Sequence, residues 1–268
     1  MRQIRFGTDG VRGPYGEWPL TERGAHVIGR AVGLWANSGR VVVGRDTRQS
    51  SPALSDALCS GLIEGGATVL DGGVLPTAAV SCAVLETGSD AGMMITASHN
   101  PWPDNGVKIL TSTGHKPSRE EMAQLESLFG MKIRAGRAGR RAVFNDPAHA
   151  WRSEMPRLNL EGTRILIDCA NGAASPHAPG VLESMGATVI KVPGSKLLDA
   201  VAECIAAAYF ADLPPEQMPD ITKPVDTAVM DAAFKFENEA LGTNELRVLI
   251  SNDLFMSKEE RKAGSSAK

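Results

Sequence analysis

Apolar positions in the first 130 residues alternate between a spacing typical of helices and one typical of buried strands. Residues 20–37 place apolar side chains at helical spacing, with Thr21 as a plausible N-cap. The Val-rich run at 40–44 is typical of a buried strand, and Ser50 or Ser51 begins a predicted helix that ends near Glu64. The same alternation predicts strands at 67–73, 91–97 and 107–111 and helices at 76–88 and 118–130, the last with a capping box of Ser118 and Glu121.

A further strand–helix–strand unit is predicted at residues 163–192. Strands that alternate with helices favour an α/β fold in which a mainly parallel, mixed sheet lies between helices. We therefore expect a first domain over residues 1–150 and the beginning of a second, incomplete α/β domain over residues 151–193.

The sequence changes character after Pro193. Only three of the 28 glycines and none of the four tryptophans follow it. Residues 196–213 and 225–241 have the apolar stripes of amphipathic helices, and ELRVLIS at 245–251 is a candidate short strand. Residues 194–268 are thus predicted to be a mainly helical tail of unknown fold.

Composition excludes several classes of protein. The net charge of -3 argues against nucleic-acid binding by charge, and no apolar run is long enough to predict a membrane span. The N-terminus has no apolar signal segment, and the four cysteines form no CxxC pair. We expect a cytoplasmic protein with reduced thiols.

Five cationic side chains gather at residues 131–142, in the sequence MKIRAGRAGRRA. They could form a patch for phosphate or nucleic acid, or simply a solvated loop or an interdomain edge. We favour the loop, because one such cluster is weak evidence of binding.

The sequence TASHNPWPDNGVK, which follows a predicted buried strand, contains the strongest candidate chemistry. Ser98 stands where ligands bind in open α/β sheets, at the carboxyl end of a strand. Its hydroxyl could be a nucleophile or a phosphate carrier, His99 could move a proton, and Lys108 could pair with phosphate. On these residues alone, a structural role for the Ser-His pair is the more common outcome.

Two other polar loops could converge with this one on a phosphate-bearing ligand. FGTDGVRG at 6–13 carries Arg12, and GRDTRQSS at 44–51 carries Arg45 and Arg48 just before a predicted helix N-terminus. Neither loop is a Walker A or GxGxxG sequence, so nucleotide binding is not supported.

FGTDGVRG, GRDTRQSS and GMMITASHNPWPDNGVKIL together resemble the α-D-phosphohexomutase superfamily, and the FGTDG opening resembles its bacterial phosphoglucosamine mutases most. The resemblance continues through ILIDCANGAAS and VLESMGATVI, and so covers about residues 3–192. It implies interconversion of glucosamine 6-phosphate and glucosamine 1-phosphate, on the route to a cell-wall precursor, with a sugar bisphosphate as intermediate and activator. Phosphomannomutase or phosphoglucomutase activity is the alternative within the family.

The resemblance also implies roles for individual residues. Ser98 matches the phosphoserine, whose phosphate would in addition be a ligand of Mg²⁺. The catalytic positions implied are Ser98, His99, Lys108 and Arg12, and those implied for phosphate or substrate binding are Thr8, Asp9, Arg45 and Asn100. The implied partner is a small phosphosugar, with no role for nucleic acid or a membrane.

The chain departs from this family after Val192. It has no DGDADR-type aspartate loop for Mg²⁺, and neither the sugar-binding nor the phosphate-binding loop of the later domains. We expect weak or absent turnover from this chain alone. A fragment that binds phosphosugar without turnover, or an interaction module that self-associates or binds a partner through its tail, remains an alternative.

Overall fold

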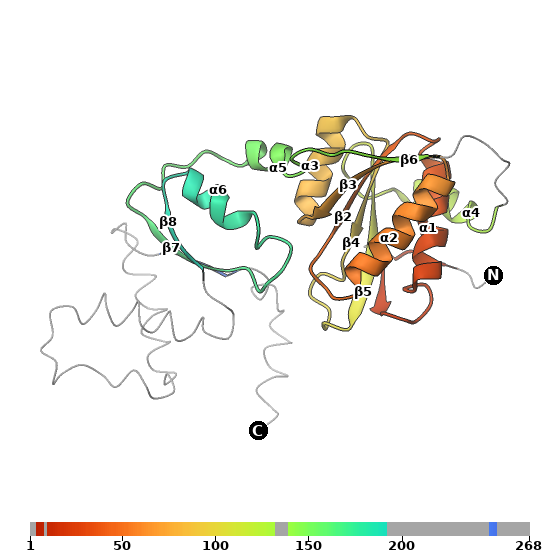
Figure 1. Cartoon of the computed structure of the whole chain (residues 1–268), viewed down its shortest axis with the longest axis horizontal. Coiled ribbons are helices and arrows are strands. Elements are labelled where there is room, and N and C mark those ends of the chain that lie inside the picture. Colours follow the sequence, from red (N-terminus) through yellow and green to blue (C-terminus); the bar gives the residue numbers. More distant parts are fainter. Residues whose placement is uncertain (1–3, 8–9, 132–138, 192–246, 251–268) are drawn as a thin grey trace, which may run out of the picture. The chain divides into compact units, whose positions relative to one another are not determined.

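A computed structural model describes residues 4–7, 10–131, 139–191 and 247–250 (Figure 1). By its internal contacts the chain divides into two compact units. The first comprises residues 1–156 and 172–174, and the second residues 157–171 and 175–268.

The first unit is built on one mixed sheet of six strands in the order β1-β5-β4-β2-β3-β6. Its central and far strands, from β4 to β6, are parallel, whereas β5 runs antiparallel to both β4 and β1. The mixed, mainly parallel α/β sheet predicted from the sequence is confirmed. The strands are β1 (Val11–Pro14), β2 (Arg40–Arg45), β3 (Thr68–Val74), β4 (Ala91–Ile95), β5 (Asp104–Thr111) and β6 (Arg140–Ala142).

Helices cover both faces of this sheet, and each face has its own apolar core. The helices α1 (Glu22–Trp35) and α2 (Ser51–Glu64) pack side by side against residues such as Val43 and Ile95, as Figure 1 shows. The other face carries α3 (Thr77–Thr87) and α5 (His149–Glu154) against residues such as Val42 and Met94. Because neighbouring strand residues point to opposite faces, the continuous apolar runs of β2 and β4 supply both cores.

Local signals place the beginnings of two helices. Thr21 Oγ1 accepts a hydrogen bond from the Gly24 amide at 3.1 Å and caps α1. At α4 (Arg119–Ser127) the predicted capping box is present, with bonds in both directions between Ser118 and Glu121. Two strands were not predicted: β1, which pairs with β5, and β6, which includes Arg140 and Arg141 of the cluster interpreted as a loop.

The second unit contains a three-stranded parallel sheet in the order β8-β7-β9. The strands are β7 (Arg164–Asp168), β8 (Thr188–Lys191) and β9 (Arg247–Ile250), and the helix α6 (Ala178–Ser184) connects β7 to β8. The strand predicted in ELRVLIS is therefore present as β9. The predicted helices at 196–213 and 225–241 lie outside the described residues.

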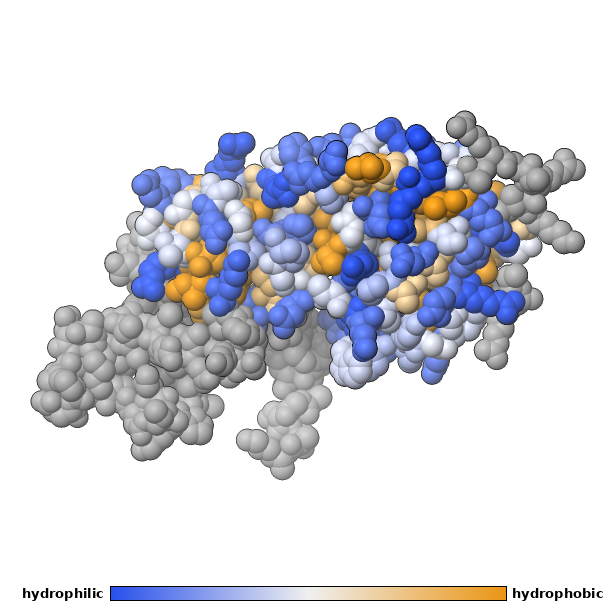
Figure 2. All heavy atoms as spheres, in the orientation of Figure 1, coloured by the Kyte–Doolittle hydropathy of each residue, from blue (hydrophilic) through white to orange (hydrophobic). Residues whose placement is uncertain are grey.

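Figure 2 shows hydrophilic side chains over much of one face, with small apolar patches between them. Among large apolar side chains, Trp102 is 76% exposed. No helix within the described ranges has the length and apolar character that crossing a membrane requires.

Candidate active site

The sheet places Ser98 directly after β4, at the carboxyl end of a strand that is buried throughout. Its backbone has a φ of 58°, which is uncommon for a residue with a side chain, and its amide donates to Thr96 Oγ1 at 3.0 Å. Ser98 and His99 are both exposed. Within the described part of the chain, no hydrogen bond reaches the Ser98 hydroxyl, so it is open to a ligand.

Strand pairing brings two predicted cations to the same sheet edge. Arg12 of β1 lies opposite Gly106 of β5, and the Gly106 carbonyl accepts a hydrogen bond from the Thr96 amide, two residues before Ser98. Lys108 lies two residues beyond Gly106 on the same face of β5 as Arg12, a diagonal arrangement within reach of long side chains. Both cations are half-buried on adjoining strands.

Gly10 of the N-terminal loop packs closely against β5. A Cβ on Gly10 would lie 2.2 Å from the Val107 carbonyl oxygen and 3.1 Å from the Lys108 Cα, so only glycine allows this approach. On the other side, the Phe6 amide donates to Glu126 Oε1 of α4 at 2.9 Å. The predicted phosphate-binding residues Thr8 and Asp9, between these anchors, lie outside the described residues.

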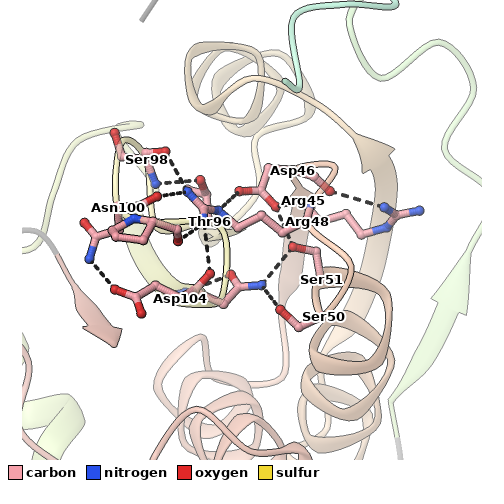
Figure 3. A network of polar contacts seen from close by, with 12 residues as sticks. Arg45, Asp46, Arg48, Ser50, Ser51, Thr96, Ser98, Asn100 and Asp104 are labelled. Carbon is pink, nitrogen blue, oxygen red and sulfur yellow. Dashed lines mark hydrogen bonds and ion pairs between the residues drawn. The ribbon is translucent and has the colours of Figure 1, made fainter. Parts of the chain in front are cut away.

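The loop after β4 is braced by its own polar side chains (Figure 3). Asn100 Nδ2 donates to Asp104 Oδ2 at 2.8 Å, so this predicted phosphate ligand holds the loop itself. Asn105 is fully buried and donates to both Ser50 Oγ and Ser51 Oγ at the start of α2. The first bond lies within the loop that follows β4, residues 96–104 (the serine loop), and the Asn105 bonds tie its C-terminal end to α2.

The two arginines of GRDTRQSS behave differently. Arg45 donates from Nη1 to the Asp46 carbonyl at 3.3 Å, and in Figure 3 its guanidinium points away from Ser98. Arg48 instead reaches the serine loop, where its guanidinium contacts backbone carbonyls including that of Ser98 itself. The sequence does not predict these contacts, because the carbonyls lie about 50 residues further along the chain than Arg48.

A complete magnesium site is not found among the described residues. They contain no group of three or more His, Cys, Asp or Glu side chains placed to hold a metal. A phosphate on Ser98 would supply one oxygen ligand, whereas Mg²⁺ requires octahedral coordination. These residues alone do not fit the ion.

Comparison with known proteins identifies residues 3–133 as a match to the family model "Phosphoglucomutase/phosphomannomutase, alpha/beta/alpha domain I". A phosphoglucosamine mutase from Rhodospirillum rubrum is 41% identical over 205 residues, which are 71% of this chain and 45% of the relative. One from Gluconacetobacter diazotrophicus is 40% identical over 201 residues, 70% of this chain and 44% of the relative.

A solved structure of a phosphoglucomutase/phosphomannomutase family protein from Burkholderia thailandensis superimposes with a TM-score of 0.58. The two sequences are 25% identical, and the match covers 76% of this chain and 49% of the other. The chain thus spans about half the length of the relatives it matches. Residues 3–133, which include the Ser98 loop and the strands β1 to β5, thus match the first domain of the phosphoglucomutase/phosphomannomutase family.

Proposed function

We propose that this chain carries the phosphoserine half of a phosphosugar mutase, with Ser98 as the group that gives and receives the phosphoryl. The observation that supports this best is the position of Ser98. Ser98 is exposed at the carboxyl end of β4. Lys108 lies on β5, the strand next to β4, and Arg12 lies on β1, the strand next to β5. A transferring phosphoryl group needs positioning and cations far more than covalent chemistry.

The proposed reaction has two transfers. A hydroxyl oxygen of the sugar phosphate attacks the phosphorus of phosphorylated Ser98, the P–Oγ bond breaks, and the hydroxyl proton passes to the departing Oγ through solvent or a nearby base. His99, exposed beside Ser98, is our candidate for that proton transfer. The sugar bisphosphate then presents its other phosphate. Ser98 Oγ attacks that phosphorus, the bond from phosphorus to the sugar oxygen breaks, the serine proton passes to that oxygen, and the monophosphate isomer leaves.

Arg12 and Lys108 are proposed to balance the charge on the phosphate of Ser98. Both side chains are half-buried, where attraction to an anion is less screened than in water. Thr8, Asp9, Arg45 and Asn100 remain predicted contributors to phosphate or substrate binding. For Asn100 the contribution would act through the loop that it braces.

Glucosamine phosphate is the proposed substrate, because the curated relatives of 40–41% identity are described as phosphoglucosamine mutases. Mannose and glucose phosphates are the alternatives. Mg²⁺ would neutralise the transferring phosphoryl group where further ligands complete its coordination. The predicted domain limits at residues 150 and 193 belong to the same proposal, in which the chain holds one whole mutase domain and part of a second.

The test follows the covalent step rather than turnover. Purified full-length chain is incubated with Mg²⁺ and glucosamine 1,6-bisphosphate, and intact mass and peptide mapping detect phosphate on Ser98. Ser98→Ala must abolish the label, while Ser127→Ala, an exposed serine on α4, must keep it. An unlabelled wild-type chain whose fold is intact would refute the proposal. Equal or faster labelling by glucose or mannose 1,6-bisphosphate would change the assigned substrate.

A further inference from the structure

The guanidinium group of Arg48 donates hydrogen bonds to the serine loop and to Asp46. Nη1 donates to the carbonyls of Pro101 at 2.7 Å and Asp104 at 3.0 Å, and Nη2 to those of Ser98 at 2.9 Å and Asn100 at 2.8 Å. Nε donates to Asp46 Oδ2 at 3.1 Å. A guanidinium has five N–H donors, so none is left for a substrate phosphate.

We propose that Arg48 is a positioning residue for Ser98, and that it holds the serine loop in the conformation that phosphoryl transfer requires. This inference rests on the function proposed above. It differs from the interpretation of GRDTRQSS as an anion-binding loop, in which Arg48 would contact the substrate.

The loop needs a cation at this point for an electrostatic reason. Four carbonyl oxygens from residues 98–104 converge on one side chain, and their partial negative charges repel one another unless a donor lies between them. Ser98 also has a positive φ, a conformation that persists only where surrounding contacts impose it. The bond from Arg48 to the Ser98 carbonyl fixes the peptide group that follows Ser98 and so constrains its orientation.

A buried carboxylate holds Arg48 in place. Asp46 is 8% exposed and accepts hydrogen bonds from the Arg48 amide, from Nε and from Ser51 Oγ. The Asp46 amide in turn donates to the Ile95 carbonyl at the end of β4 at 2.9 Å. As Figure 3 shows, Asp46 and Arg48 join the segment after β2 and the segment after β4 into one network of polar contacts.

Lysine could not replace this arginine. An ammonium group keeps the charge beside Asp46, but its three donors lie on one atom and cannot bond to four carbonyls at once. Arg48→Lys therefore separates loop positioning from charge pairing, and it avoids the unpaired buried carboxylate that Arg48→Ala would leave. Arg152→Lys is a matched control, because Arg152 Nη2 contacts both carboxylate oxygens of Asp146 away from the loop.

Two measurements on the full-length chain test the inference. The first is amide hydrogen exchange of residues 97–105. We expect exchange at least about tenfold faster in Arg48→Lys, the value of one lost charge-assisted hydrogen bond, with β2 and α2 unchanged. The second is the rate of Ser98 labelling against the concentration of glucosamine 1,6-bisphosphate. We expect the saturating rate to fall at least about tenfold while the half-saturating concentration stays constant. Arg152→Lys should match the wild type in both.

The outcomes separate the two proposals. A wild-type chain that takes no label refutes the phosphoserine function, and loop exchange then decides the role of Arg48 alone. Unchanged exchange in Arg48→Lys overturns the inference. A raised half-saturating concentration with an unchanged saturating rate also overturns it, because that result assigns Arg48 to substrate binding.

Discussion

Gly106 shows how closely single residues set the geometry beside Ser98. A Cβ at this position would lie 2.6 Å from the carbonyl oxygens of both Thr96 and Val11, and 3.0 Å from Arg12 Cγ. The first two contacts are backbone atoms of the flanking strands, which cannot turn aside as a side chain can. The absence of a side chain at Gly106 therefore lets β1 carry Arg12 next to the end of β4.

We predict that Gly106→Ala destabilises the protein by about 1–3 kcal/mol, the usual cost of overpacking, and slows Ser98 labelling. Urea unfolding measures the first effect and intact mass the second. Gly180→Ala is the comparison, because nothing lies within 4 Å of its added methyl group on α6, and alanine is the better helix former. Equal stability of Gly106→Ala and the wild type would contradict the packing argument.

Cys59 on α2 gives a prediction for pH dependence. Burial, with a smaller contribution from Asp71, raises the pKa of this thiol from 9.0 to about 11. The folded state thus favours the neutral thiol, and the associated stability is complete below pH 9 and lost as the pH rises toward 11.

The free energy of unfolding should therefore fall by about 3 kcal/mol at most between pH 9 and 11 through Cys59 alone, at about 1.4 kcal/mol per pH unit. Denaturant unfolding of the wild type and Cys59→Ala across this range isolates the effect, because other titrating groups are common to both. Parallel pH profiles for the two proteins would show that Cys59 does not contribute.

At the scale of elements, the stability of α4 affects the N-terminal loop of the candidate site. Its capping box joins Ser118 and Glu121, and Glu126 on the same helix accepts the Phe6 amide. The ring of Phe129, just beyond the helix, stacks on Phe6 with 6.1 Å between centroids. Phe6, the first residue of FGTDG, is thus anchored on α4.

Ser118→Ala should cost about 1 kcal/mol of stability, because it removes the cap of the Glu121 amide. We also expect faster hydrogen exchange at the Phe6 amide, whose acceptor lies on the weakened helix. Ser127→Ala, at the other end of α4, should change neither by more than a few tenths of a kcal/mol. A Phe6 amide that exchanges equally in all three proteins would separate α4 from the N-terminal loop.

Elements with local signals could be predicted from the sequence, whereas the short strands β1 and β6 could not. The helices α1 and α4 carry their own caps at Thr21 and Ser118. In contrast, β1 is a short, glycine-containing segment whose partner on β5 is over 90 residues away. The same reason hides the role of Arg48, since its pattern predicts an anion ligand and only the fold brings the carbonyls to it.

At the scale of the whole molecule, the chain spans about half the length of its curated relatives. Phosphoryl-transfer catalysis depends on preorganised charge around the whole phosphosugar, and in the proposed function the described residues supply one side of that charge. We therefore predict that steady-state conversion of glucosamine 6-phosphate is at least about a hundredfold slower than single Ser98 labelling, the effect of losing preorganised donors. A coupled assay beside the labelling experiment compares the two rates, and equal rates would contradict the prediction.

The composition change at Pro193 does not mark the end of the second sheet. Strand β9 lies beyond it and pairs in parallel with β7, with Leu166 opposite Val248, so β7 has a neighbour on each side. Truncation after residue 246 removes β9 and leaves one side of β7 without partners for its backbone groups. Because each lost backbone hydrogen bond costs about 1 kcal/mol, amides of Ile165–Asp168 should exchange roughly five- to tenfold faster.

The strands of the first unit provide the internal control for this truncation. Exchange within Arg40–Arg45 should stay the same, because β2 pairs with β3 and β4 inside that unit. Unchanged protection of both β7 and β2 would mean that β9 contributes nothing to the second sheet. Faster exchange in β7 alone would establish that residues after Pro193 stabilise the second sheet.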